Sequence, residues 1–317
     1  MNVLIIGIGI IGTIYGWALQ QAGIPVTHYV RPGKTERRSG EALLDLLDER
    51  QGFPRFSKIY YPWQCLETIP ANESFELVIV PTNLYQTETA LRQVYPQLPE
   101  ASYLVLSANW LGDSAFKAII PEQQLVLGYP DGGGTLIGDV YWTNLGAEIH
   151  LPSSDGPNGA AIQKVTQLFA AAGIQPDYQS NMLHWLWVHN ATSMPIWAAY
   201  LQHCDMELLL KDQSLLRQAF TAVRECLDLC VARGVALNNY EDTAIFKLPD
   251  SLIGIMFKML YYFNQSMQRD IAHAAQGFME VQANYGQICA TARELQIPLP
   301  AFTALGKVFE TKSLDPN

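Results

Sequence analysis

The sequence predicts an N-terminal α/β domain with a doubly wound, mostly parallel sheet, followed by an all-α C-terminal domain. Short runs rich in β-branched residues alternate with helical patterns through the first half of the chain. A glycine-rich turn joins the first of these runs to the first helical pattern, and only helical periods follow Met182. We therefore expect one domain at residues 1–178 and a second at residues 179–317.

The elements of the first domain follow from these patterns in chain order. Strands are expected at residues 2–6, 25–30, 77–81, 103–107 and 124–128, and helices at about 10–22, from near Gln86, and at about 158–173. The segments 131–144 and 147–159 indicate further strands with turns. In the second domain, helices are expected from Met182 to about Leu295, with turn residues clustered near 233–239 and 247–254.

Composition limits the classes of function. A chain of 317 residues with 49% hydrophobic and 16% charged residues is typical of a globular protein of two domains. A formal net charge of −10 argues against nucleic acid as a partner. The first residues carry no basic leader, and glycines interrupt the apolar run before it could cross a membrane, so we expect a cytoplasmic protein that does not bind membranes.

The cysteines predict neither a disulfide framework nor a metal site. There are five of them, an odd number, scattered along the chain. Cys226 and Cys230 share an apolar helical pattern without a nearby histidine or second cysteine pair, so we expect buried thiols and no metal.

The turn after the first strand has the spacing G-x-G-x-x-G, formed by Gly7, Gly9 and Gly12. Such glycines permit a tight turn, let the backbone approach a pyrophosphate, and let the helix pack against the strand, while the helix N-terminus offers unpaired N–H groups. The motif predicts a Rossmann domain that binds a dinucleotide through Gly7, Ile8, Gly9, Ile10, Ile11 and Gly12.

The end of the second strand indicates which dinucleotide is bound. An acidic residue there would bind the ribose 2′-hydroxyl of NAD, but the chain has "HYVRPGK", which offers Arg31 and Lys34. These side chains suit a 2′-phosphate, so NADP is favoured.

At this point the chain resembles the ketopantoate reductase family, whose members join a Rossmann domain to a helical domain and reduce a 2-keto acid with NADPH. Besides the two motifs above, four segments carry the resemblance. "LVIVPTNLYQTETAL" (77–91) is similar to the family's strand and Lys-x-x-Gln element, and "LSANWLG" (106–112) to its Gln-Asn-Gly segment. "NATSMP" (190–195) is similar to Asn-x-x-x-Asn-Pro, and "EVQANYG" (280–286) to Glu-Ile-Asp-x-x-Asn-Gly.

The resemblance implies roles for individual residues. Asn109 would contact the nicotinamide ribose and the substrate, and Asn83 occupies the position of the family's cofactor-side lysine. Asn190 and Glu280 would hold the substrate carboxylate or hydroxyl, and Ser266 resembles the substrate-binding serine. We also name Gly134, in the glycine run after residue 131, as a cofactor-binding candidate.

The family's proton donor is missing. The family's general acid is a lysine one helical turn before the first asparagine of the 190–195 segment, and here that position is Leu186. The second asparagine is Met194. His189 and Glu280 are the candidates for a replacement acid, although His189 would equally suit a core position among the neighbouring tryptophans.

Three functions remain open. The first is an NADPH-dependent oxidoreductase that transfers hydride to the carbonyl of a small or medium, more hydrophobic substrate than ketopantoate. The second is a non-catalytic NADP-binding sensor or scaffold. The third, an opine or hydroxy-acid dehydrogenase, would need a catalytic histidine paired with a carboxylate, and the sequence shows no such pair. Apolar helices such as Leu252 to Phe263 would serve a homodimer interface as readily as a core.

Overall fold

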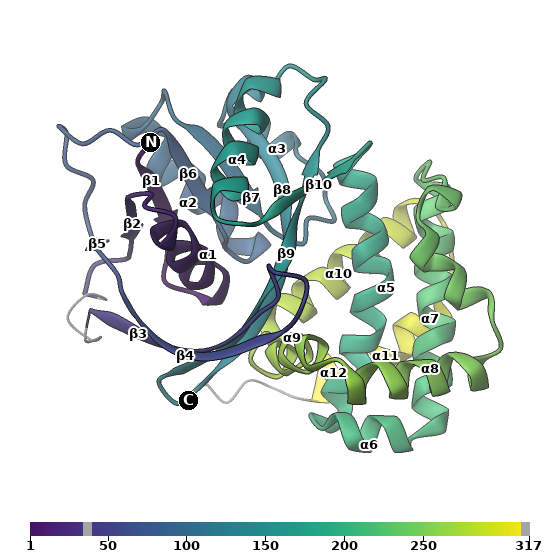
Figure 1. The fold of residues 1–317 in the computed structure, drawn as a ribbon. Coiled ribbons are helices and arrows are strands. Elements are labelled where there is room, and N and C mark those ends of the chain that lie inside the picture. The colour runs from purple at the N-terminus through teal and green to yellow at the C-terminus, as the bar shows by residue number, and fades with distance from the viewer. Residues whose placement is uncertain (34–39, 312–317) are drawn as a thin grey trace. The chain divides into compact units, whose positions relative to one another are not determined.

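The computed structural model describes residues 1–33 and 40–311, without the side chains of 274–276 and Thr311. The chain divides into two compact units (Figure 1). One comprises Met1–Ala108 and Gly112–Met182, and the other Asn109–Leu111 and Leu183–Asn317. The first is an α/β unit and the second is helical, as the sequence predicts.

The α/β unit is built on a ten-stranded sheet with the order β4-β3-β9-β8-β7-β6-β1-β2-β5, and β10 pairs with β9. Its strands are β1 (Val3–Ile6), β2 (Val26–Tyr29), β3 (Glu41–Asp48), β4 (Arg55–Pro62), β5 (Cys65–Leu66), β6 (Leu77–Val80), β7 (Ser102–Leu106), β8 (Leu125–Ile137), β9 (Val140–Pro152) and β10 (Gln175–Gln179). The run from β5 to β8 is parallel throughout, whereas β8 with β9 and β3 with β4 are antiparallel.

The centre of this sheet contains a topological switch point. From β1 the chain passes to β2 on one side, and it later returns to β6 on the other side. The residues of β1, β6 and β7 are almost entirely buried and rich in valine, isoleucine and leucine, as a strand covered on both faces requires. Ligands of open α/β sheets bind where the carboxyl ends of such diverging strands meet.

The helices of this unit are α1 (Ile10–Gln21), α2 (Leu84–Val94), α3 (Ser114–Lys117) and α4 (Gly159–Ala171), with 3₁₀ turns η1 (Tyr95–Gln97) and η2 (Glu122–Gln124). α1 and α4 pack together through an edge-to-face contact between Tyr15 and Phe169, whose ring centroids lie 4.9 Å apart. Both rings are fully buried.

The predicted elements of this unit are confirmed within a few residues, but the sequence missed several strands. No element was predicted between residues 31 and 76, where the antiparallel pair β3 and β4 forms one end of the sheet. The short strands β5 and β10 were also missed. The two segments expected as further strands form one long hairpin, in which β8 and β9 pair from Ile137 and Val140 outward.

The helical unit contains the elements α5 (Met182–His203), α6 (Met206–Lys211), α7 (Gln213–Ala232), η3 (Leu237–Asn239), η4 (Glu241–Lys247), α8 (Asp250–Phe263), α9 (Gln265–Gln276), α10 (Phe278–Glu294), α11 (Pro300–Leu305) and α12 (Lys307–Thr311). Its core is centred on α7, where Phe220, Cys226 and Cys230 are buried. Burial raises the pKa of the Cys230 thiol to about 12, so this side chain stays uncharged. The turn expected over 247–254 is mostly helix, because α8 begins at Asp250.

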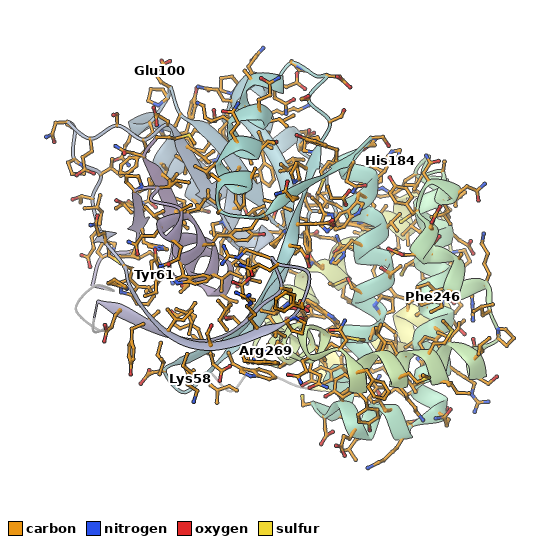
Figure 2. All side chains as sticks on the ribbon, viewed as in Figure 1. Lys58, Tyr61, Glu100, His184, Phe246 and Arg269 are labelled. Atoms are coloured by element: carbon orange, nitrogen blue, oxygen red, sulfur yellow. The ribbon has the colours of Figure 1, made fainter. Side chains whose placement is uncertain are left out.

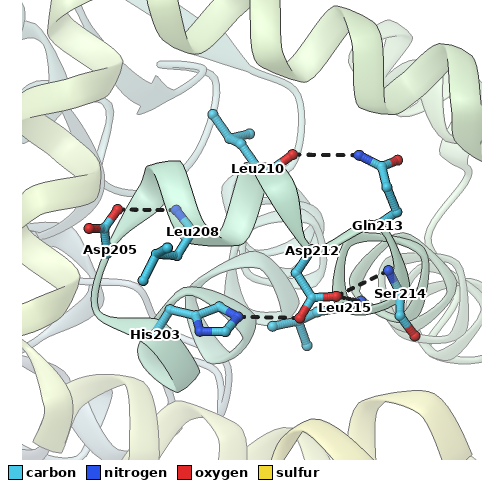
Figure 3. Close-up of polar contacts among 8 residues, drawn as sticks. All are labelled: His203, Asp205, Leu208, Leu210, Asp212, Gln213, Ser214 and Leu215. Carbon is cyan, nitrogen blue, oxygen red and sulfur yellow. Dashed lines mark hydrogen bonds and ion pairs between the residues drawn. The ribbon is translucent and has the colours of Figure 1, made fainter.

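Two aspartates set the helix boundaries between α5 and α7 (Figure 3). Asp205 Oδ1 accepts a hydrogen bond from the N–H of Leu208 (3.1 Å), which caps α6. Asp212 Oδ1 accepts from the N–H groups of Ser214 (3.1 Å) and Leu215 (3.0 Å), which caps α7. These bonds satisfy helix N–H groups that lack intrahelical acceptors and define where each helix starts.

All five cysteines are free thiols. Within the described residues, none of the helices is long and apolar enough to cross a membrane.

Candidate functional site

The glycine turn begins directly at the end of β1. Gly7 has φ +88°, a backbone conformation that L-residues with a side chain rarely adopt. Its N–H donates to the Tyr29 carbonyl (2.8 Å), so the turn is tied to β2. Gly9 is in an extended conformation at the N-cap of α1, and the helix begins at Ile10.

The other two glycines differ in what surrounds them. A Cβ on Gly12 would lie 3.0 Å from Ile5 Cγ2 and 3.3 Å from the Gly7 carbonyl oxygen, so glycine is needed there for α1 to pack against β1. A Cβ on Gly9 would meet no atom within 4 Å. Gly9 therefore leaves an open approach to the backbone, which is what a pyrophosphate requires.

The N-terminus of α1 suits an anion. The first turn contains no acidic residue, and no side chain caps it. The first N–H groups of a helix have no intrahelical acceptor, and they carry the positive end of the helix dipole. Ile10, Ile11 and Gly12 supply these groups, so the predicted loop has the backbone donors and the open face that a diphosphate needs.

Asn83 and Asn109 follow β6 and β7, the next two strands of the sheet on one side of β1. Asn83 is at the N-cap of α2, directly beyond β6, and its Nδ2 donates to Tyr85 Oη (3.3 Å). Asn109 follows the end of β7 and is buried. β7, β6 and β1 are consecutive parallel strands, so their carboxyl ends lie at the same edge of the sheet.

The segment Asn109–Leu111 groups with the helical unit, where Trp110 anchors it. The indole of Trp110 is fully buried, and its Nε1 donates to Thr291 Oγ1 (2.9 Å). The Arg233 guanidinium lies over the Trp110 ring and donates through Nη2 to the Trp110 carbonyl (3.0 Å). Burial lowers the pKa of Arg233 to about 10, so it remains charged at neutral pH.

The loop after β2 contacts one residue that the sequence reasoning missed. Arg31 is exposed, as a cofactor-contacting cation in a loop would be, and Lys34 lies outside the described residues. Glu67, which follows β5, accepts a hydrogen bond at Oε1 from the N–H of Gly33 (3.0 Å). A carboxylate thus lies at this loop although the linear segment 28–34 contains none. Only the parallel pairing of β2 with β5 brings it there.

Gly134 has a reason to be glycine that does not involve a cofactor. It has φ +130°, and a Cβ would lie 2.2 Å from the Trp142 carbonyl oxygen. Close approach of β9 to β8 therefore requires glycine at this position.

On the helical unit, Asn190 of α5 is fully buried. Its Nδ2 donates to the Leu186 carbonyl one turn earlier (2.8 Å), while its Oδ1 has no partner among the described residues. Leu186 and Met194 are also buried, and Met194 belongs to the hydrophobic core. The positions that hold polar residues in the family pattern are thus apolar on both sides of Asn190.

His189 is stacked on Trp185 of the same helix, with ring centroids 5.3 Å apart and planes within 8° of parallel. This contact matches the packed position that the sequence allowed for His189. Its part in catalysis stays a prediction.

Glu280, in the first turn of α10, has a histidine partner. His273 Nε2, on α9, lies 3.5 Å from Glu280 Oε2, and the imidazole also meets Trp197 of α5 edge-to-face at 6.3 Å. The sequence analysis did not reveal this histidine–carboxylate pair. It could not, because α9 and α10 fold against each other around Gly277, which brings together side chains from two helices.

Two further polar side chains lie on these helices. Ser266, on α9, is nearly buried. Asn284 lies one turn beyond Glu280 on α10, is 1% exposed, and has no partner for Nδ2 or Oδ1 among the described residues. The sequence analysis quoted Asn284 within a motif but gave it no role. The sequence could have indicated it, because Asn284 lies four residues after Glu280 and therefore on the same face of the helix.

No group of three or more histidine, cysteine, aspartate or glutamate side chains that could hold a metal was found in the described part of the chain.

Two family models match the chain. The family model "Ketopantoate reductase PanE/ApbA" matches residues 3–155, and "Ketopantoate reductase PanE/ApbA C terminal" matches residues 181–313. No curated protein sequence matches the chain.

Solved structures show the same fold. A 2-dehydropantoate 2-reductase from Geobacter metallireducens superposes with a TM-score of 0.75 at 16% identity, covering 99% of this chain and 100% of that one. D-Mandelate dehydrogenase with NADH and anilino(oxo)acetate gives 0.73 at 15% identity, covering 98% and 97%. The dimeric ketopantoate reductase from Staphylococcus aureus gives 0.65 at 16% identity, covering 98% of each chain.

The fold and the glycine turn define a nicotinamide-dinucleotide-dependent oxidoreductase with a Rossmann domain and a helical domain. The two family models together span most of the chain, which belongs to the ketopantoate reductase family.

Proposed function

We propose that the protein reduces the carbonyl of a small or medium 2-keto acid, more hydrophobic than ketopantoate, with NADPH as the hydride donor. The observation that carries the proposal is the glycine turn. Gly9 leaves the backbone open, the first turn of α1 has no acidic residue, and the turn lies at the switch point of the sheet. We expect such an enzyme in the cytoplasm.

The preference for NADPH rests on Arg31. An exposed guanidinium at the end of β2 would pair with a 2′-phosphate, and Lys34 would add to it. The negative charge of Glu67 would repel a 2′-phosphate if its side chain turned toward the cofactor. In the structure it instead accepts a hydrogen bond from the N–H of Gly33. We propose that Glu67 stabilises the conformation of the loop and that Arg31 binds the 2′-phosphate.

A carbonyl reduction needs a hydride at the carbonyl carbon and a proton at the oxygen. The reduced nicotinamide, when bound, would supply the hydride. Because Leu186 replaces the lysine of the family pattern, we assign the proton to His273. Its Nε2 lies 3.5 Å from Glu280 Oε2, so the carboxylate can orient the imidazole, and an imidazole is a common proton donor in catalysis. His273 is partly exposed, so solvent can return the proton.

Asn190, Ser266 and Asn284 would orient the substrate. The unpartnered Oδ1 of Asn190 and the unpartnered amide of Asn284 are buried acceptors and donors that a hydroxyl or carboxylate would satisfy. The apolar Leu186 and Met194 favour a hydrophobic substrate chain. A structurally similar D-mandelate dehydrogenase was solved with anilino(oxo)acetate, an aromatic oxo acid, which supports this choice of substrate class.

The alternative is a protein that binds NADP without catalysis. Leu186 and Asn83, at the positions of two family lysines, favour it. Both functions require cofactor binding, so only turnover distinguishes them.

The test begins with calorimetric affinities for NADPH and NADH. NADPH should bind more tightly, and Arg31→Ala should reduce the difference by about 1–3 kcal/mol. NADPH oxidation is then followed with ketopantoate, aliphatic 2-keto acids and phenyl-substituted 2-keto acids. We expect the phenyl-substituted acids to react fastest, and ketopantoate at least about a hundredfold more slowly than with an ordinary family member. Tight NADPH binding without turnover of any acid would favour the non-catalytic alternative.

The assignment of the proton donor has its own test. His273→Gln and Glu280→Gln should lower kcat about 10²-fold or more with the best acid. His203→Gln is a matched control, because His203 is also paired with a carboxylate, Asp212, in the same unit. If the two histidine variants lose activity equally or neither does, His273 is not the acid, and His189→Ala is the next variant to measure.

We further propose that the protein is a homodimer that associates through α8. The helix is apolar nearly all round. One side packs inward, where Phe257 meets Phe220, while large apolar side chains on the other side are exposed. The exposed ones are Leu252, Ile255, Met256, Met259, Leu260, Tyr262 and Phe263. A helix with this composition is normally covered on all sides, and a second copy of the same helix is a matching surface.

A further inference from the structure

The carbonyl of Gly7, in the glycine turn, forms a hydrogen bond with a buried histidine of β2. His28 Nδ1 lies 2.8 Å from the Gly7 oxygen, and His28 Nε2 lies 3.0 Å from Tyr61 Oη on β4. Both side chains are completely buried. Tyr61, labelled in Figure 2, points toward α1, and a Cβ on Gly16 of that helix would lie 2.6 Å from its Oη.

These contacts fix the tautomer of His28. A carbonyl oxygen can only accept, so Nδ1 carries the hydrogen and donates to Gly7. Nε2 is then an acceptor, and the Tyr61 hydroxyl donates to it. Burial keeps the imidazole neutral by lowering its pKa to about 4.

The direction of the Gly7 carbonyl determines the direction of the next N–H. In a trans peptide the C=O and the following N–H point in opposite directions, and the described chain contains no cis peptide. Because His28 holds the Gly7 oxygen on the buried side, the N–H of Ile8 points away from the sheet. Tyr141 of β9 acts in the same way on the next peptide, since its hydroxyl donates to the Ile8 oxygen (2.9 Å) and leaves the N–H of Gly9 pointing outward.

We propose that His28 is a positioning residue for the dinucleotide, which sets the orientation of the Gly7–Ile8 peptide so that its N–H can bind the pyrophosphate. The Tyr61 hydroxyl donates to Nε2 and so satisfies the other ring nitrogen, and Tyr141 orients the second peptide. The inference rests on the proposed function, because it assumes that a nicotinamide dinucleotide binds at this turn. It adds a residue outside the glycine motif to the machinery that binds the cofactor.

Two substitutions at the same position separate positioning from packing. An asparagine amide reaches about as far as Nδ1 of histidine, and a glutamine amide about as far as Nε2. His28→Asn therefore keeps a donor for the Gly7 oxygen and loses the contact with Tyr61, whereas His28→Gln does the reverse. Tyr61→Phe is the matched control, because it removes the Tyr61 hydroxyl and leaves Nδ1 with its carbonyl.

The affinity for NADPH is compared with that for adenosine 2′-phosphate, which lacks the pyrophosphate. We expect His28→Gln to weaken NADPH binding about tenfold to a hundredfold, the range for a hydrogen bond to a charged group. His28→Asn and Tyr61→Phe should stay within about threefold of the unmutated protein, and adenosine 2′-phosphate should bind all four proteins alike. Chemical-denaturant unfolding of each variant shows whether stability follows the same order, which a purely structural role would require.

Three results would count against the inference. Equal NADPH affinities of His28→Asn and His28→Gln would overturn it while leaving the proposed function intact. Nitrogen NMR of the unmutated protein offers a second measurement that needs no variant, and a proton found on Nε2 of His28 instead of Nδ1 would also overturn it. Failure of the unmutated protein to bind NADPH would reject the proposed function and this inference together.

Discussion

At the scale of single residues, His28 links the stability of the α/β unit to pH. Burial lowers its pKa from 6.5 to about 4 in the folded protein, so between these values the unfolded chain binds more protons at this site. The stability that the neutral imidazole contributes is therefore complete above the unfolded pKa and is lost as pH falls toward the folded one.

We expect the free energy of unfolding to fall by about 2–3 kcal/mol through His28 alone between about pH 7 and about pH 4.5. Urea unfolding at the two pH values gives the total change, and His28→Gln removes the part that belongs to this imidazole. An unchanged pH dependence in His28→Gln would mean that His28 is protonated in the folded state or that it stays solvated.

Leu186 is the second residue where a single change is informative. Leu186→Lys restores the lysine of the family pattern at a position that is 1% exposed. We expect ketopantoate reduction to rise by less than about tenfold, because Asn83 and Met194 still leave the substrate without its other contacts. The buried amine should also lower stability, since a desolvated charge is costly. The value of kcat/KM for ketopantoate checks this, and a rise of about a hundredfold or more would show that the lysine alone was missing.

Some residues of the site could be predicted from a short segment of sequence, whereas the role of others depends on segments far apart in the chain. Gly7, Gly9 and Gly12 could be predicted because the turn, the open approach and the helix contact arise within one short segment. His28 could not, because its role depends on Tyr61 of a strand that the sequence did not reveal. The pairing of His273 with Glu280 depends on the packing of two helices, which a pattern along the chain does not specify.

At the scale of elements, the same division holds. β1, β6 and β7 are continuous apolar runs rich in β-branched residues, so their sequence agrees with their structure. β3, with the sequence "EALLDLLD", consists mostly of residues that favour helices: glutamate, alanine and leucine. It is a strand because β4 and β9 pair with it on both sides, and alternate side chains are buried. Tertiary pairing overrides local propensity there.

The β8–β9 hairpin gives a prediction at this scale. Gly134 and Gly138 both have positive φ, but a Cβ would be 2.2 Å from the Trp142 oxygen at Gly134 and would meet nothing within 4 Å at Gly138. Gly138→Ala should cost about 1 kcal/mol for backbone strain, and Gly134→Ala at least about 2 kcal/mol more, because β9 must move away from β8. Thermal and urea unfolding of both variants measure the difference. Equal costs would indicate that the two strands separate there without penalty.

At the scale of the whole molecule, surface chemistry decides which partners are possible. The chain has a formal net charge of −10, so an anionic dinucleotide must be attracted by local groups: the N-terminus of α1 and Arg31. The exposed side of α8, in contrast, is apolar and suits an apolar partner. After Asp250 the helix carries one charged residue, Lys258, so little on this helix opposes a second apolar surface.

The last prediction concerns this surface. Light scattering coupled to size exclusion should give twice the mass of the chain, because an isologous pairing of α8 with its copy would cover the apolar side chains of both subunits. Ile255→Glu and Met259→Glu place charges in the centre of that surface and should give a monomer that still binds NADPH, since the glycine turn belongs to the other unit. Ile137→Glu is the control, because Ile137 is equally exposed at the end of β8 and should leave the dimer intact. A monomeric unmutated protein at micromolar concentration, or a dimer unaffected by both α8 variants, would contradict the prediction and leave α8 to another partner.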